Sequence, residues 1–270
     1  SIKWNFIEGT ILSKPISNHT YWYKIDINNS SDDFFLLLDY ALIELIDVYF
    51  VSDSGLIHKS ASGTRLNFNQ REIKSVNHVF KIPKGSFTCF IRLENSFNFQ
   101  FPMKINNSEY LLQKEAISYL VLGWNFGVLI LLFVINILVY LAFKERIYMY
   151  YLCYMLFLIV GAATHLGITG QFLWPLHPVF NNFLWSYTSF VFVYMALFIK
   201  DLLKIKIHFP NYLKVFYLFV FIFTFNVMLH FFNPLLSIAI IQYTIPIFNL
   251  FLFFIGIKTL LSQRDLFSIY

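Results

Sequence analysis

The stretch ISYLVLGWNFGVLILLFVINILVYLAF, residues 117–143, decides the fold of this chain. It contains no charged side chain, and it is longer than the roughly 20 apolar residues that a helix needs to cross a bilayer core of about 30 Å. The charged run Lys144–Arg146 ends it abruptly. The residues before it are polar, and those after it are almost continuously apolar. We therefore predict a transmembrane helix that divides an aqueous domain, residues 1–116, from a membrane domain, residues 117–270.

The composition of the chain agrees with this division. Hydrophobic residues make up 58% of the sequence and charged residues 13%, whereas a soluble domain carries roughly 25% charged residues. The first domain has twelve basic and twelve acidic side chains, and the second has eight and three, so the second supplies the whole net charge of +5. Because this positive charge lies in short loops between apolar segments, it argues against nucleic acid as a partner.

The first domain has the pattern of short β-strands. Apolar and polar side chains alternate along Tyr21–Asn28 and again along Phe87–Glu94, which is typical of half-buried strands. Several short strands separated by turn signals predict an all-β sandwich. Further strands are expected at Phe34–Tyr40, Ile46–Val51, Val79–Ile82 and Phe99–Ile105.

The second domain is predicted to be an all-α, polytopic bundle. Its five apolar segments are 117–143, 147–169, 179–199, 215–232 and 237–257.

All eight basic residues of this domain lie in alternate loops, and the loops Gly170–Pro178 and Asn233–Leu236 contain none. By the positive-inside rule, the first domain is extracytoplasmic and the basic loops are cytoplasmic. Gln263–Asp265 is expected to be a cytoplasmic turn, with a sixth helix beginning near Leu266. We expect the chain to be a fragment that stops before helices six and seven.

The sequence offers no catalytic, metal-binding or cofactor-binding motif. Cys89 and Cys153 are not expected to pair, because one lies in each domain. His165, His177 and His230 fall near the outer ends of predicted helices, where solitary interfacial histidines are commoner than a metal or pH-sensing site. We therefore expect no enzymatic activity in these residues, and any catalytic output domain would follow Tyr270.

Two features of the first helix suggest close helix packing. Gly123 and Gly127 have the small-xxx-small spacing that lets two helices approach each other, either within the bundle or in a homodimer. Asn125 and Asn136 lie near one helical face and suit hydrogen bonds between helices or a part in switching. The preceding link, Asn106–Ala116, lacks glycine and proline and should be stiffer than a Gly/Ser tether. A movement of the sandwich could therefore reach the first helix.

Five residues of the first domain are candidates for a ligand site. Aromatic faces stack on sugars, and guanidinium groups bind carboxylates. Core packing and contacts between strands explain the same side chains, and this is the favoured interpretation of each. The candidates are Trp22, Tyr40, Tyr49, Arg71 and Arg92.

The order of features resembles a known family, the bacterial seven-transmembrane receptors with diverse intracellular signalling modules. Each matching motif is short, and the resemblance rests on their order over essentially the whole chain. In the first domain the motifs are Tyr21–Lys24 before Asn28-Asn29, Phe35–Tyr40, Asp47–Tyr49, Gly63, Arg71, Phe90–Arg92 and Phe101-Pro102. In the second they are Gly123–Gly127, Asn136, Tyr148–Tyr151, Gly170–Pro175 and the Phe198–Pro210 loop.

This resemblance implies a sensory receptor in the bacterial inner membrane. Its outer domain would be a jelly roll, similar to carbohydrate-binding modules, that binds a small molecule. The helices would relay binding to a cytoplasmic kinase, cyclase or phosphatase module in the same chain. The competing class is a transporter or membrane-embedded enzyme with an accessory outer domain, which charged residues in further helices would favour.

Overall fold

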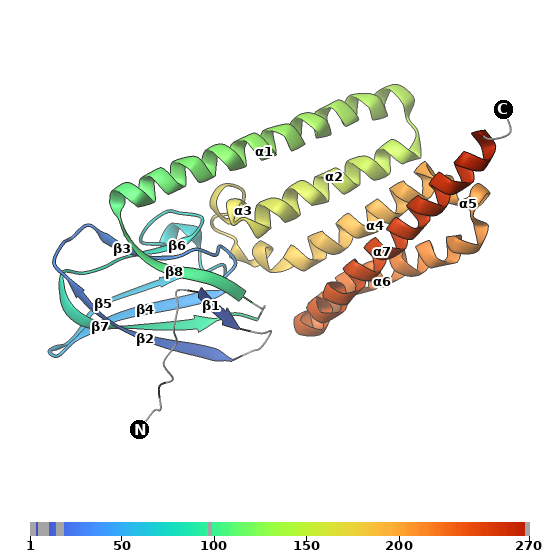
Figure 1. The fold of residues 1–270 in the computed structure, drawn as a ribbon. Helices are drawn as coiled ribbons and strands as arrows, with labels where there is room; N and C mark the ends of the chain where they lie inside the picture. The colour runs from blue at the N-terminus through green and yellow to red at the C-terminus, as the bar shows by residue number, and fades with distance from the viewer. Residues whose placement is uncertain (1–3, 5–10, 15–18, 97–98, 268–270) are drawn as a thin grey trace. The chain divides into compact units, whose positions relative to one another are not determined.

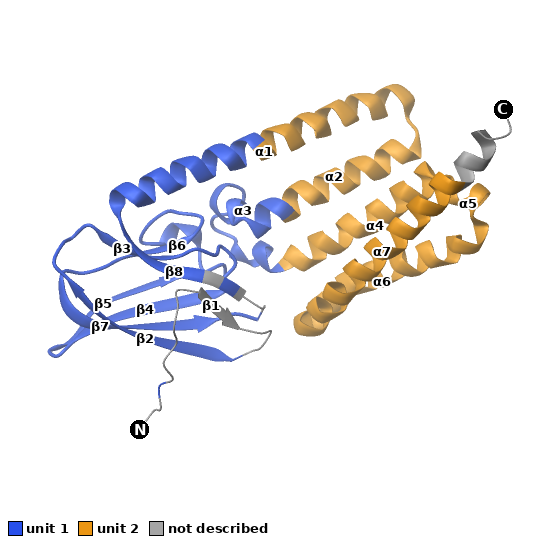
Figure 2. Cartoon of the chain, viewed as in Figure 1, with its two compact units in different colours: residues 1–124, 162–182 blue, residues 125–161, 183–270 orange. Residues whose placement is uncertain are grey.

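The computed structural model describes residues 4, 11–14, 19–96 and 99–267. The chain forms two compact units (Figure 2). One consists of residues 1–124 and 162–182, and the other of residues 125–161 and 183–270. The first unit therefore contains the β-strands, the beginning of the first helix and the segment that follows the second helix.

The strands form two antiparallel four-stranded sheets with the orders β1-β8-β3-β6 and β2-β7-β4-β5 (Figure 1). Eight strands in two sheets with these crossings make a jelly roll, so the predicted β-sandwich is confirmed. Their bounds are β1 Ile11–Lys14, β2 Thr20–Asn29, β3 Phe34–Leu38, β4 Leu45–Ser52, β5 Gly55–Ser62, β6 His78–Lys81, β7 Gly85–Glu94 and β8 Phe99–Asn107.

Alternation along the strands builds the core of the sandwich. In β7, Phe87, Cys89, Ile91 and Leu93 are buried, and the residues between them are only half-buried. Strand β3 differs because Leu36, Leu37 and Leu38 are all buried. One face of β3 contributes to the core between the sheets, and Leu37 on the other face packs with Val79 and with Leu111 of the first helix.

Strand β5 is missing from the strands predicted above, for a physical reason. It pairs only with β4 and forms an edge of its sheet. Leu56 and Ile57 are exposed there, so the strand shows no alternation of apolar and polar residues. Strand β1 is only four residues long and is likewise too short for such a pattern.

The predicted link Asn106–Ala116 is not a loop. Strand β8 ends at Asn107, and helix α1 (Ser108–Phe143) begins at the next residue (Figure 1). The Asn107 side-chain oxygen accepts a hydrogen bond from the backbone N–H of Tyr110 at 3.0 Å, which caps the first turn. The sandwich therefore passes directly into α1.

Five helical stretches among the described residues are long and apolar enough to cross a membrane, as predicted. The helices after α1 are α2 Arg146–His165, α3 Ile168–Phe172, α4 Leu184–Leu202, α5 Ile205–His208, α6 Leu213–Phe232 and α7 Pro234–Phe267. Three short 3₁₀ turns are η1 Phe68–Gln70, η2 Pro178–Phe183 and η3 Pro210–Tyr212.

The turn expected at Gln263–Asp265 is helical, because α7 runs unbroken to Phe267. Neither glycine nor proline interrupts the sequence there, and a short charged run does not by itself end a helix. A sixth helix beginning near Leu266 is therefore not seen. Residues after Phe267 lie outside the described part of the chain.

In the second unit, aromatic side chains form the contact between α4, α6 and α7. Phe216, Phe223 and Phe248 are fully buried in this cluster. A buried polar contact accompanies them, because the Asn226 side-chain amide donates to the Ser189 hydroxyl at 3.0 Å. Hydrogen-bonded pairs of this kind hold membrane helices together.

Candidate functional site

The outer face of the sheet β2-β7-β4-β5 gathers three of the five candidate residues. Strand register places Trp22 beside Arg92, and Arg92 beside Asp47. Two residues further along, Lys24, Phe90 and Tyr49 lie side by side in the same way. Because side chains of one parity share a face, all of these point away from the core.

Aromatic rings form a platform on this face. Trp22 is 49% exposed, and its ring lies nearly parallel to that of Tyr49, with centroids 6.1 Å apart and an interplanar angle of 23°. The Lys59 ammonium lies 5.1 Å from the Tyr49 ring centroid. The Phe90 ring lies 6.1 Å from that of Trp4, which is also exposed. Trp22 and Trp4 are exposed, and Tyr49 and Phe90 are half-buried. Apolar groups gathered in this way mark interaction sites more often than singly scattered ones do.

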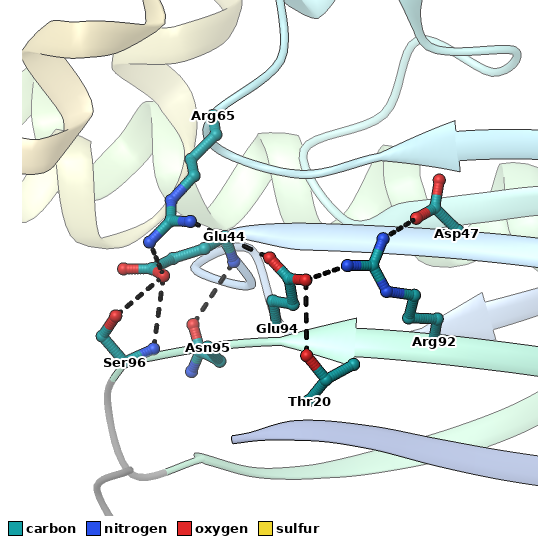
Figure 3. Close-up of polar contacts among 8 residues, drawn as sticks. All are labelled: Thr20, Glu44, Asp47, Arg65, Arg92, Glu94, Asn95 and Ser96. Carbon is teal, nitrogen blue, oxygen red and sulfur yellow. Dashed lines mark hydrogen bonds and ion pairs between the residues drawn. The ribbon is translucent and has the colours of Figure 1, made fainter. Parts of the chain in front are cut away.

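Charged side chains continue from this platform along one edge of the sandwich (Figure 3). The Arg92 guanidinium donates to Asp47 at 3.0 Å and also pairs with Glu94. Glu94 accepts a hydrogen bond from the Thr20 hydroxyl at 3.4 Å and lies 4.0 Å from the Arg65 guanidinium. Arg65 in turn forms an ion pair with the buried carboxylate of Glu44.

Glu44 is held by several donors besides Arg65. The backbone N–H and the hydroxyl of Ser96 donate to its carboxylate at 3.3 and 3.0 Å. Its own backbone N–H donates to the Asn95 side chain at 3.3 Å. A buried carboxylate needs such compensation, because an unpaired one costs several kcal/mol.

This cluster of Glu44, Asp47, Arg65, Arg92 and Glu94 contains two guanidinium groups and three carboxylates, which gives it a formal charge of −1. The Arg92 guanidinium is thus already engaged by two carboxylates of the protein. The cluster therefore disfavours an anionic ligand, and the carboxylate-binding role that the sequence suggested for Arg92 does not follow from its surroundings.

A hollow of about 350 Å³ opens at one end of the same sheet. Its size is at the lower end of the range for small-molecule sites. Most of its walls are carboxylate, amide and hydroxyl groups. The lining residues are Asp26, Ile27, Asn28, Val51, Ser52, Asp53, Ser86, Phe87 and Thr88.

Tyr40 and Arg71 do not lie on the aromatic platform. Tyr40 packs against the sandwich core, and burial raises the pKa of its hydroxyl. Arg71 donates to the carbonyl of Ser75 at 2.7 Å and to that of Val76 at 3.2 Å, and its guanidinium lies over the Phe68 ring. Burial lowers the Arg71 pKa to about 10, so the side chain still carries its charge at neutral pH.

The segment 166–182, between α2 and α4, contacts the loops of the sandwich. The Phe68 N–H donates to the Pro175 carbonyl at 3.0 Å. The Asn181 amide donates to the Thr64 carbonyl at 3.2 Å. Gly167 adopts φ +74°, and a Cβ added there would lie 2.8 Å from the Ala41 side chain. Only glycine therefore fits at this contact.

The first helix also joins this contact region. The Lys114 ammonium pairs with Asp39, whose other carboxylate oxygen accepts from Asn77 at 2.7 Å. The Tyr119 hydroxyl donates to the Gln171 side chain at 2.9 Å. The beginning of α1 and the segment 166–182 thus contact the same end of the sandwich.

The candidate packing residues of α1 are placed as follows. A Cβ added at Gly123 or Gly127 would meet nothing within 4 Å. The Asn136 amide donates to the Leu132 carbonyl of its own helix at 2.8 Å, and Asn125 lies on the same helix. The part of these four residues in packing or switching stays a prediction.

The three candidate histidines lie in different surroundings. His165 is exposed at the end of α2, His177 lies against Phe180, and His230 is buried on α6 near Phe183. The described residues contain no group of three or more His, Cys, Asp or Glu side chains placed to hold a metal ion.

Sequence analysis missed Phe90, Asp47 and Glu94 on the outer face, as well as Arg65 and Asn181. For Phe90 the signal was present, because it alternates with buried Cys89 and Ile91. For the other four the decisive information is which strands and loops become neighbours, and a single sequence does not contain it.

Two models of known families together match nearly the whole chain. Residues 1–107 match the family model 7TMR-DISM extracellular 2, and residues 118–270 match the family model 7TM diverse intracellular signalling. A search of curated proteins gave no match. The resemblance inferred from short motifs is thus confirmed. The chain belongs to the seven-transmembrane receptors with diverse intracellular signalling modules, and it is a multi-pass membrane protein with an extracellular N-terminal domain.

Proposed function

We propose that the protein is a sensory receptor of a bacterial inner membrane whose jelly roll binds a small, neutral, hydroxyl-rich ligand such as a carbohydrate. The helices pass the binding event to a cytoplasmic signalling module of the same chain. The observation that carries this proposal is the nearly parallel pair of the exposed Trp22 and the half-buried Tyr49 on the outer sheet face.

The aromatic platform suits the apolar face of a sugar ring. A flat ring stacked on Trp22 would bury apolar area without removing any hydrogen-bonding group from water. The platform is also rigid, because Trp22, Tyr49 and Phe90 stand on strands that pair with one another. A rigid surface loses little conformational entropy when it binds.

At the Arg92 end of the platform the charges favour a neutral ligand over an acid, and Lys24 and Lys59 lie at the Tyr49 end. Arg92 is engaged by Asp47 and Glu94, and the cluster carries a formal charge of −1. A ligand carboxylate would have to displace one of these protein carboxylates and leave it near the same cluster. Hydroxyl groups face no such competition.

The polar hollow supplies acceptors for ligand hydroxyl groups. Asp26, Asn28 and Asp53 line it with side-chain oxygens. Asp26 and Asn28 lie on the same face of β2 as Trp22, because they differ from it by an even number of residues. A ligand longer than one ring could therefore stack on the platform and donate hydrogen bonds into the hollow.

Binding to an array of neutral and acidic oligosaccharides, with the full chain in lipid nanodiscs, tests this proposal. We expect binding to neutral members and a loss of about tenfold or more in Trp22→Ala, equivalent to about 1.4 kcal/mol. Tyr49→Ala should weaken the same interaction. The matched control is Tyr110→Ala, because Tyr110 is also exposed but lies at the start of α1.

Two results would count against this site. If Trp22→Ala binds as tightly as Tyr110→Ala, the aromatic platform is not the contact surface. If acidic members bind more tightly than neutral ones, the preference argued from the Arg92 pairing is wrong.

A further inference from the structure

The segment 166–182 contacts the loops of the sandwich, so a movement of these loops would displace it. Gly167 lies two residues after α2 ends, and Asn181 lies three residues before α4 begins. Both make contacts with the sandwich loops, Gly167 at Ala41 and Val76 and Asn181 at Thr64. A shift of these loops therefore acts on the ends of two membrane helices, in addition to the direct connection through β8 and α1.

Asn181 is the central polar group of this contact. Its amide nitrogen donates to the Thr64 carbonyl, and its oxygen accepts from the Trp174 indole N–H at 2.8 Å and from the Thr169 hydroxyl at 3.5 Å. The side chain thus organises its own segment and at the same time attaches that segment to residue 64 of the sandwich.

Thr64 is followed by Arg65, which belongs to the charged cluster beside the outer face. The backbone N–H groups of Thr64 and Arg65 donate to the carbonyls of Ile43 and Glu44 at 2.8 and 3.1 Å. A Cβ at Gly63 would lie 2.2 Å from the Glu44 carbonyl oxygen, so the two backbones meet in a contact that excludes any side chain. Residues 63–65 therefore move with Glu44.

Glu94 connects residues 63–65 to the aromatic platform. One of its carboxylate oxygens pairs with Arg92, and the other lies 4.0 Å from Arg65 (Figure 3). Glu94 is thus shared between a guanidinium group beside Trp22 and a guanidinium group beside Thr64. In this structure Glu94 lies closer to Arg92, and a shift toward Arg65 would give a second arrangement.

We propose that Arg65 is the positioning residue that couples the outer face to the docking of the segment 166–182. A group bound beside Trp22 changes the pairing of Arg92, which changes how strongly Glu94 holds Arg65. Arg65 directly follows Thr64, whose carbonyl accepts the hydrogen bond from Asn181. A shift of Arg65 therefore changes the contact that docks the segment 166–182. Coupling requires that both sites bias one element with two arrangements, and the shared Glu94 is that element.

The test uses thiol labelling of the full chain in detergent and needs no ligand. The reporter is Val76→Cys, because Val76 is 7% exposed and lies beneath Gly167. Cys153 is replaced by alanine. Cys89 is kept as an internal measure of unfolding, because it is fully buried in the sandwich core and burial raises its pKa to about 12. Mass spectrometry of peptides separates the two labelling rates.

We expect Asn181→Ala to raise the labelling rate at position 76 and to define the undocked state. Arg65→Gln should raise this rate about 2- to 10-fold, the lower part of the range found for side chains that share one network. Arg92→Gln should raise it less, and it should add nothing when combined with Arg65→Gln, because its effect passes through Arg65. The matched control is Lys81→Gln, which removes one exposed positive charge from β6.

Three outcomes would overturn the proposal. The first is an Arg65→Gln rate equal to that of Lys81→Gln. The second is an additive effect of Arg65→Gln and Arg92→Gln. The third concerns Arg92→Gln, which keeps the Arg65–Glu44 pair. If Cys89 also becomes reactive in Arg65→Gln, the sandwich itself has opened, and Arg92→Gln is then the variant that tests the proposal. No increase in labelling at position 76 in Arg92→Gln would overturn it.

This inference rests on the proposed receptor function only for its biological meaning. Because the labelling experiment contains no ligand, its failure would leave the aromatic platform untouched as a binding surface. A failure of oligosaccharide binding would in turn leave the coupling between Arg65 and Asn181 measurable.

Discussion

His78 shows how one buried residue makes the sandwich sensitive to acid. It is fully buried, and its Nδ1 lies 2.7 Å from the Ser62 hydroxyl. Burial, together with the nearby charge of Arg71, lowers the pKa of His78 well below 6.5, although a hydrogen bond with the Ala41 backbone opposes the shift. The folded protein therefore keeps this imidazole neutral where an unfolded chain would protonate it.

The sign of the resulting pH dependence follows directly. Above about pH 6.5, His78 is neutral in both states and contributes nothing to the dependence. Below that pH the unfolded state binds a proton that the folded state does not, so stability falls by up to about 1.4 kcal/mol per pH unit. We expect His78→Gln to flatten this loss between pH 6.5 and 5.

The measurement is the Cys89 labelling rate of His78→Gln relative to the unsubstituted chain at each pH, with a thiol reagent active in acid. This ratio cancels the pH dependence of the reagent. The control is His58→Gln, because the His58 side chain is 40% exposed and faces Glu72. A ratio that stays constant from pH 7.5 to 5 would show that His78 does not set the acid response.

At the residue scale, the sequence indicated which face of a strand each side chain occupies, but it did not indicate which side chains or carbonyl groups each residue contacts. Alternation placed Trp22, Lys24 and Asp26 outward, as the structure confirms. Arg71 could not be placed, because its partners are carbonyl groups of a loop whose course no periodicity describes. Side chains that cross between loops depend on the three-dimensional path of the chain.

Among the elements, the segment 166–182 depends on one glycine. Gly167 has φ +74°, and a methyl group there would meet the Ala41 side chain at 2.8 Å. Gly167→Ala combines this clash with an unfavourable left-handed backbone, which costs about 1 kcal/mol or more for residues other than glycine. We expect it to undock the segment and to increase labelling in the Val76→Cys background.

Gly123→Ala is the matched comparison, because a Cβ at position 123 would meet nothing within 4 Å. In a helix this change should be neutral or slightly stabilising, since alanine favours the helix by about 1 kcal/mol over glycine. Unchanged labelling in Gly167→Ala would refute the docking argument. A defect in Gly123→Ala would mean that the Gly123–Gly127 face contacts a surface outside this chain, such as a second copy.

The connection from β8 to α1 gives a second prediction at this scale. No residue separates the two elements, and Leu111 of the first turns packs against Leu37 and Val79. A flexible Gly/Ser insert of about ten residues after Asn107 would release α1 from the strand, because such linkers behave as random coils. In a receptor carrying its output module, ligand binding should persist while signalling output is lost.

The control for this insert is the same Gly/Ser sequence placed in the exposed segment between β2 and β3, at Asp32-Asp33, which does not line the hollow. Output that survives the insert after Asn107 unchanged would argue against mechanical coupling through α1. The contact between Asn181 and Thr64 would then be the remaining route for coupling between the sandwich and the helices.

Elements with strong periodicity were the ones that sequence could predict. The five spans and the alternating strands β2 and β7 fall within a few residues of their expected positions, apart from the ends of α1 and α7, which extend further. The start of α1 was placed nine residues too late, because its first turns are polar and lie outside any hydropathy window. The edge strand β5 lacked a pattern, because its exposed half carries Leu56 and Ile57 and its buried positions are Ser60 and Ser62.

For the whole molecule, the contacts of the segment 166–182 bear on the topology. This segment follows the second predicted span, and it hydrogen-bonds to the extracellular sandwich at Thr64 and Phe68. It therefore lies on the same side of the membrane as the sandwich. Charge had led to the same placement, because the loop 170–178 contains no lysine or arginine. The two arguments are independent, one from packing and the other from the positive-inside rule.

The remaining loops follow from alternation, and labelling of single cysteines in a Cys-free background tests them. Ser54→Cys reports on the sandwich, because Ser54 is exposed in the β4–β5 turn. Ser60, further along β5, is buried and unsuitable. Lys206→Cys reports on the loop between α4 and α6, where Lys206 is exposed. An impermeant thiol reagent applied to intact cells, with the outer membrane permeabilised where one is present, should label Ser54→Cys and spare Lys206→Cys. After lysis both should react, which controls for access. If Lys206→Cys is labelled in intact cells, an odd number of spans does not separate the two sites, and the assignment of the basic loops to the cytoplasm is wrong.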